Sequence, residues 1–136
     1  MNSDDEIRQI LTSVKTIAVV GFSANPARPS HGVAAFLQRK GFRVIPVNPG
    51  LAGQTQLGET VYASLADIPD PIDMVDVFRA SEFVAGVMEE AIAVKAKVVW
   101  TQLDVVDEAA AARGGAAGLR VVMNRCPAIE MPRLGL

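Results

Sequence analysis

Cysteine and histidine are almost absent from this chain. Among its 136 residues there is one cysteine, Cys126, and one histidine, His31. An internal disulfide needs two cysteines, and a zinc site built of cysteine and histidine needs several such ligands. The composition therefore excludes a disulfide scaffold and a cysteine–histidine zinc centre, and we expect no metal site.

Long apolar runs are also lacking. No uninterrupted apolar stretch approaches the roughly 18 residues that a membrane span requires. The N-terminus is acidic (Asp4, Asp5 and Glu6), whereas a secretory signal begins with positive charge. We therefore expect a cytoplasmic protein without a membrane partner. The length is that of one domain, so we expect a single domain over residues 1–136.

Acidic residues are missing from residues 7–58, although the whole chain carries a net charge of −2. The same stretch holds six of the 13 basic residues, Arg8, Lys15, Arg28, Arg39, Lys40 and Arg43. The overall charge argues against general nucleic-acid binding, while the uneven distribution favours a local site for an anionic ligand. The alternative interpretation is that these basic residues are scattered over a solvated face.

Hydrophobic patterning predicts strands that alternate with helices. Apolar runs rich in β-branched residues predict strands at 16–21, 42–47, 73–78, 97–101 and 119–123. Helical spacing predicts helices that start at a Ser3–Glu6 capping box and at the caps Ser30 and Ser81. Such alternation, at intervals of about 25 residues, builds βαβ units with right-handed crossovers. We expect a Rossmann-like three-layer α/β/α sandwich with a mostly parallel five-stranded sheet.

The loop after the first strand has the chemistry of a phosphate site. Ligands of such sheets bind beyond the carboxyl ends of the strands, and a helix N-terminus there favours phosphate. Gly21 allows close backbone approach, Ser23, Asn25 and Ser30 offer hydrogen bonds, and Arg28 offers a bidentate cation. We expect the loop to hold an anionic ligand; alternatively, Ser30 only caps a helix and Arg28 only faces water.

Two common nucleotide fingerprints do not match this loop. Ser23 and Pro26 stand where a G-x-G-x-x-G motif has its second and third glycines, and no GK[ST] ending follows. An NAD site also needs an acid after the second strand, where this chain has Val47, Asn48 and Pro49. Ordinary NAD or nucleoside-triphosphate binding is therefore disfavoured.

Eight segments, in order along most of the chain, resemble a known family. They are residues 19–23 (VVGFS), 25–30 (NPARPS), 43–49 (RVIPVNP), 57–59 (LGE), 62–69 (YASLADIP), 75–79 (VDVFR), 100–103 (WTQL) and 122–127 (VMNRCP). The chain resembles the small stand-alone CoA-binding proteins related to the nucleotide-binding domain of the succinyl-CoA synthetase alpha subunit. The resemblance implies a nucleotide-binding, Rossmann-like domain whose ligand is coenzyme A.

The resemblance also implies a set of binding residues. It places Gly21, Ser23, Arg28 and Ser30 around the phosphates, Val47 and Asn48 near the adenosine, and Phe78, Arg79 and Gln102 along the remaining ligand surface. The implied site residues are Gly21, Phe22, Ser23, Asn25, Arg28, Ser30, Val47, Asn48, Pro49, Phe78, Arg79 and Gln102. Two positions depart from the family pattern: Asp104 stands where glycine is expected after Gln-Leu, and Asn124 where aspartate is expected before Arg-Cys. If Asp104 faces the ligand, its carboxylate repels phosphate.

Three functions stay open at this point. The first is binding of CoA or an acyl-CoA without catalysis, alone, as a homodimer or with an enzyme that acts on acyl-CoA. The second is an NAD(P)-dependent oxidoreductase in which Arg28 or Arg43 takes the 2′-phosphate and His31 is the acid or base. The third is a protein-interaction subunit that has lost ligand binding, as Asp104 and Asn124 would allow.

Two further side chains have competing interpretations. Cys126 follows Arg125, which favours a reactive thiolate, but a buried inert cysteine is the commoner case. Trp100 lies within a predicted strand, so we expect it in the core.

Overall fold

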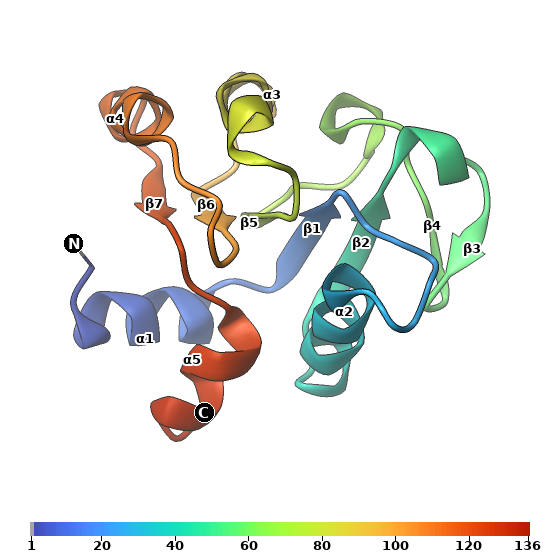
Figure 1. The fold of residues 1–136 in the computed structure, drawn as a ribbon, viewed down its shortest axis with the longest axis horizontal. Coiled ribbons are helices and arrows are strands. Elements are labelled where there is room, and N and C mark those ends of the chain that lie inside the picture. Colours follow the sequence, from blue (N-terminus) through green and yellow to red (C-terminus); the bar gives the residue numbers. More distant parts are fainter. Residues whose placement is uncertain (1) are drawn as a thin grey trace.

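The computed structural model describes residues 2–136, and the predicted fold class is confirmed (Figure 1). Five strands form one sheet in the order β2-β1-β5-β6-β7, and every neighbouring pair is parallel. These strands are β1 (Thr16–Val20), β2 (Arg43–Val47), β5 (Met74–Val77), β6 (Val98–Thr101) and β7 (Arg120–Val122). Because the chain moves from β1 to β2 and then crosses to β5 on the other side, the strand order reverses beside β1.

Helices cover both faces of the sheet. The helices are α1 (Asp4–Ser13), α2 (Pro29–Arg39), α3 (Val84–Ala93), α4 (Glu108–Ala116) and α5 (Pro127–Arg133). Figure 1 shows α1, α2 and α5 on one side and α3 and α4 on the other. Each side has its own buried apolar cluster, one around Ile10, Leu37 and Trp100 and the other around Val75, Met88 and Val99.

Short elements complete the connections. They are the 3₁₀ turns η1 (Pro49–Leu51), η2 (Leu65–Asp67) and η3 (Ser81–Phe83), and the antiparallel strands β3 (Thr55–Gln56) and β4 (Glu59–Thr60). No helix within residues 2–136 is long and apolar enough to cross a membrane.

The helix starts agree only in part with the predictions. Ser3 caps α1 as expected, since its Oγ accepts from the Glu6 N–H, but the Glu6 carboxylate accepts from Asn2 instead of completing a capping box. The predicted Ser30 cap is wrong: α2 begins at Pro29, whose fixed φ suits the first helical position, and Arg28 precedes it as the cap residue. The predicted Ser81 cap is also wrong, because its hydroxyl bonds Asp104 and Val106 in a neighbouring loop.

Candidate functional site

A cavity of about 600 Å³ opens beside the loop that joins β1 to α2. It lies at the carboxyl ends of β1, β2 and β5, the edge at which parallel sheets bind ligands. Its walls are Gly21, Phe22, Ser23, Ala24, Asn25, Arg28, Pro29, Ser30, Asn48, Gly50, Leu51 and Phe78. We name it the loop cavity.

A second cavity of about 400 Å³ adjoins the first, and Gly21, Asn48 and Gly50 line both. The remaining walls are Val20, Val47, Pro49, Ala63, Ser64, Leu65, Arg79, Val87 and Glu90. We name it the apolar cavity. All the predicted site residues except Gln102 line one cavity or the other.

Gly21 lines both cavities, and a side chain there would crowd the end of β5. Its φ is +85°, and a Cβ built on it would lie 3.0 Å from the carbonyl oxygen of Phe78 and 3.2 Å from Cγ of Arg79. Gly21 therefore lets the ends of β1 and β5 come together.

Backbone N–H groups of the β1–α2 loop donate hydrogen bonds to the side-chain oxygens of the same loop and of the start of α2. The Ser23 N–H donates to Ser30 Oγ (2.9 Å), the Asn25 N–H to Ser23 Oγ (3.1 Å), and the Ala27 N–H to Asn25 Oδ1 (3.0 Å). Each side chain is fixed by the bond it accepts, and its hydroxyl or amide protons remain to be donated. The loop therefore presents donors in fixed positions, which suits an anion.

Both polar atoms of the Asn48 side chain bond the backbone on the two sides of the loop cavity. Its Nδ2 donates to the Phe22 carbonyl (2.7 Å), and its Oδ1 accepts from the Gly50 N–H (2.8 Å). The carbonyl of Val47 accepts from the N–H groups of Gly21 and Phe22. These bonds tie the end of β2 to the start of the β1–α2 loop, so Asn48 positions both walls of the loop cavity.

The electrostatics of the loop cavity come from Arg28. Arg28 is exposed, makes no ion pair within residues 2–136, and lines a cavity whose walls include no carboxylate. Arg43, by contrast, bonds Glu59 (3.3 Å) and Asp70 (2.9 Å), which raise the pKa of its guanidinium. Arg43 also starts β2, at the opposite end of the strand from the cavities. Of the two predicted phosphate-binding arginines, the structure brings only Arg28 to this site.

His31 packs against an aromatic ring. Its imidazole lies 5.6 Å from the Phe22 ring, between centroids, and no side-chain hydrogen bond orients it within the described chain. A general acid or base normally has an orienting partner, so this geometry gives the oxidoreductase hypothesis no catalytic dyad.

Gln102 lines neither cavity. Its Nε2 donates to Oδ1 of Asp76 at 2.9 Å, and both side chains are buried. The other carboxylate oxygen of Asp76 has no partner in residues 2–136, and burial raises the pKa of Asp76 to about 7. The sequence carried one signal of this pair, an aspartate inside an otherwise apolar strand. Asp73, which precedes β5, accepts instead from the backbone N–H groups of Lys15 and Thr16.

The two departures from the family pattern are bonded to each other. The Asp104 N–H donates to Oδ1 of Asn124 (2.7 Å), and both residues have positive φ, +67° and +59°. The left-handed backbone explains why glycine suits position 104. Neither residue lines the loop cavity or the apolar cavity, so the Asp104 carboxylate is not part of their walls.

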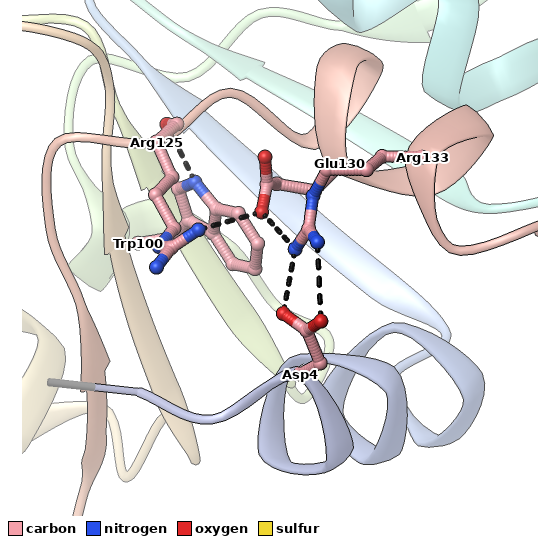
Figure 2. Close-up of polar contacts among 5 residues, drawn as sticks. All are labelled: Asp4, Trp100, Arg125, Glu130 and Arg133. Carbon is pink, nitrogen blue, oxygen red and sulfur yellow. Dashed lines mark hydrogen bonds and ion pairs between the residues drawn. The ribbon is translucent and has the colours of Figure 1, made fainter.

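Cys126 and Trp100 belong to a buried region beside α5. Trp100 is fully buried, as predicted, and its indole N–H donates to the Arg125 carbonyl (2.8 Å). Cys126 is buried too, and desolvation raises the pKa of its thiol, which favours the inert interpretation. The Arg125 guanidinium bonds Glu130 (2.8 Å), which in turn bonds Arg133, and Arg133 bonds Asp4 of α1 (Figure 2). Residues 2–136 contain no cluster of potential metal ligands.

Comparison with known proteins identifies the family. Residues 15–132 match the model of the CoA binding domain, which is most of the chain. The chain belongs to this family. The match spans every strand of the sheet and the walls of both cavities.

Relatives of this family member include small proteins and ligases. It is 43% identical over 124 residues to uncharacterized protein YneT of Bacillus subtilis (strain 168), covering 91% of this chain and 90% of that protein. The solved structure of cell-free ID.343 from Thermus thermophilus aligns with a TM-score of 0.93 and 38% identity, over 98% of this chain and 99% of that one. An ADP-forming acetate–CoA ligase II of Archaeoglobus fulgidus is 33% identical over 78 residues, 56% of this chain but 11% of that enzyme.

Proposed function

We propose that this protein binds coenzyme A, free or acylated, across the two cavities beside Gly21. The observation that carries the proposal is the loop cavity itself: fixed hydrogen-bond donors and the unpaired Arg28, with no carboxylate on its walls. CoA carries a diphosphate, an adenine and a thin pantetheine arm. It therefore needs donors and a cation in one region and apolar walls in another.

The diphosphate fits the loop cavity and the adenosine fits the apolar cavity. Ser23, Asn25, Arg28 and Ser30 supply donors to phosphate oxygens, and the N-terminus of α2 adds a favourable dipole. Val47 and Pro49 supply apolar contact for the base, and Phe78 supplies it for the pantetheine arm. Gln102 belongs to the support beneath this surface through its bond to Asp76.

We infer that the protein has no catalytic activity of its own and serves as a carrier, a sensor or a partner of an enzyme that acts on acyl-CoA. No cysteine, histidine or carboxylate lines the loop cavity, so a nucleophile paired with a base is lacking on its walls within residues 2–136. Sequence similarity to acetate–CoA ligases supports the link to acyl-CoA chemistry.

Thermal unfolding with CoA, acetyl-CoA, NAD and NADP tests the ligand. A ligand at 100 times its dissociation constant adds about 2.7 kcal/mol to the free energy of unfolding. We expect CoA and acetyl-CoA to raise Tm and NAD to leave it unchanged. A rise with NAD or NADP alone would favour the oxidoreductase, and no response to any of the four would favour the interaction subunit.

Replacement of Arg28 tests the site. We expect Arg28→Ala to weaken CoA binding, measured by calorimetry, by about 1.5–3 kcal/mol, because a charge-assisted bond to phosphate is lost. Arg39→Ala is the matched control, since Arg39 is an exposed residue in the last turn of the same helix, away from both cavities. Equal affinities of the two variants would remove Arg28 from the site.

A further inference from the structure

Arg79 is the cation of the apolar cavity, and the function proposed above leaves it without a role. It follows β5 by two positions and is half-buried, and its aliphatic stem packs beside Gly21. Within residues 2–136 its guanidinium makes no ion pair and donates no hydrogen bond to a side chain. A cation on a ligand-sized cavity, without a carboxylate partner, is free to meet an anion of the ligand.

The Arg79 guanidinium lies over an aromatic ring. The guanidinium carbon is 4.0 Å from the centroid of the Phe83 ring, and Phe83 itself is 44% exposed. A guanidinium attracted to an aromatic face still carries N–H donors for an anion. Phe83 therefore restrains the Arg79 side chain, which reduces the entropy lost when its guanidinium binds an anion.

The positions of the two arginines match the charges of CoA. Arg28 lines the loop cavity and Arg79 the apolar cavity, and Gly21, Asn48 and Gly50 are shared by both. CoA likewise carries two separate phosphate groups, the diphosphate and the 3′-phosphate of the ribose. The donors of the β1–α2 loop suit the diphosphate, so the 3′-phosphate, attached to the adenosine, falls to the cavity that holds Arg79.

We propose that Arg79, held by Phe83, recognises the ribose 3′-phosphate and makes this site selective for CoA over dephospho-CoA. The proposal rests on the proposed function, because it assumes that CoA occupies both cavities. Glu90 is the carboxylate on the same cavity. Since Glu90 repels phosphate and accepts from amino groups, the 3′-phosphate faces Arg79 and the adenine amino group faces Glu90.

The test measures two ligands against two variants. Calorimetry gives the dissociation constants of CoA and dephospho-CoA for the unmodified protein, Arg79→Gln and Arg39→Gln, each checked for unchanged Tm without ligand. We expect the unmodified protein and Arg39→Gln to prefer CoA by about tenfold or more, as a charge-assisted bidentate contact implies. Arg79→Gln should lose this preference by binding CoA more weakly while it binds dephospho-CoA about as well as before.

A third variant tests the role of the contact between Arg79 and the Phe83 ring. Phe83→Leu keeps the Arg79 charge but removes the ring, so the preference for CoA should fall between those of the unmodified protein and Arg79→Gln. If Arg79→Gln weakens both ligands equally, or neither, the assignment of Arg79 is wrong although CoA binding stands. If the unmodified protein binds neither ligand, the proposed function itself fails.

Discussion

Asp76 is a buried carboxylate whose ionisation couples the stability of the chain to pH. It lies on β5 between Val19 of β1 and Trp100 of β6, and it is fully buried with one oxygen unpartnered in residues 2–136. Burial raises its pKa from 3.8 to about 7, so between these values the folded state holds a proton that the unfolded state releases. Its contribution to stability is therefore full below about pH 4 and is lost as the pH rises to 7.

Asp76→Asn tests this linkage. The amide keeps an acceptor for Gln102 and removes the buried charge, so the variant should be at least as stable as the original chain at pH 8. The part of the pH dependence due to Asp76, on the order of 2–4 kcal/mol between pH 4 and 7, should disappear. Urea unfolding at several pH values measures it, with the exposed Asp104→Asn as control. An unchanged slope in Asp76→Asn would contradict the assignment.

A second prediction at the residue scale concerns the backbone and the position of Gly21. Gly21→Ala should destabilise the fold by about 1–2 kcal/mol through the left-handed backbone alone, with a further cost from the contact with Phe78. It should also weaken CoA binding, because Gly21 lines both cavities. Gly53→Ala is the matched control: its φ is +87°, but a Cβ there meets nothing within 4 Å. A similar loss of CoA affinity in both variants would show that strain, not the site, is responsible.

The sequence predicted which residues line the cavities better than it predicted where each side chain points. Ser23, Asn25 and Ser30 could be chosen because their strand and loop positions are local features of the chain. The direction of Gln102 depends on Asp76, 26 residues earlier, and only the pairing of β5 with β6 brings the two together. A non-local partner of this kind leaves no signal in residue spacing.

Among the structural elements, α1 and α5 are linked by a set of ion pairs that includes one buried carboxylate. Glu130 of α5 accepts from Arg125 and Arg133 at 2.8 Å each, and Arg133 reaches Asp4 of α1 (Figure 2). Desolvation opposes ionisation of Glu130, but the bonds from Arg133 and Arg125 outweigh it and hold its pKa below the ordinary 4.5. The resulting stability is present above pH 4.5 and is lost as the pH falls through the folded value.

Glu130→Gln should cost about 1.5–3 kcal/mol of unfolding free energy at pH 7, because two charge-assisted bonds are weakened inside a nearly buried group. The difference from the original chain should shrink below pH 4.5, which urea unfolding at pH 7 and pH 4 measures. Glu89→Gln is the control, since Glu89 pairs with Arg113 at the surface and should cost no more than about 1 kcal/mol. Equal costs for the two variants at pH 7 would mean that the buried cluster adds nothing.

Helices and strands could be predicted from the sequence where their hydrophobic pattern extends over several residues. The main strands and helices follow from apolar runs and helical spacing, whereas β3 and β4, of two residues each, are too short to show alternation. The serine caps at Ser30 and Ser81 failed for a different reason. Each hydroxyl is engaged by a backbone N–H from another loop position, Ser23 and Val106, and these bonds arise only in the folded chain.

Over the whole molecule, not every cation of the acid-free stretch 7–58 is free to meet a ligand. Arg43 is neutralised by Glu59 and Asp70, and Lys40 lies over the Phe36 ring and donates to the carbonyl of Leu136. Of the six basic residues in the stretch, Arg28 lines the loop cavity and none lines the apolar cavity. The sequence thus predicted the fold class and the sheet edge at which the two cavities lie, but the folded structure decides which charges remain available to a ligand.

The pair between Asp4 and Arg133 has a consequence for chain connectivity. It joins the first helix to the last, and two bonds of 2.8 and 3.2 Å fix them. Because the pair brings together a helix near each end of residues 2–136, a circular permutant with a peptide linker between those ends and new termini at an exposed turn such as Ala52–Gln54 should keep the pair. Such a circularly permuted protein would have its new termini between η1 and β3 and should retain the same sheet order.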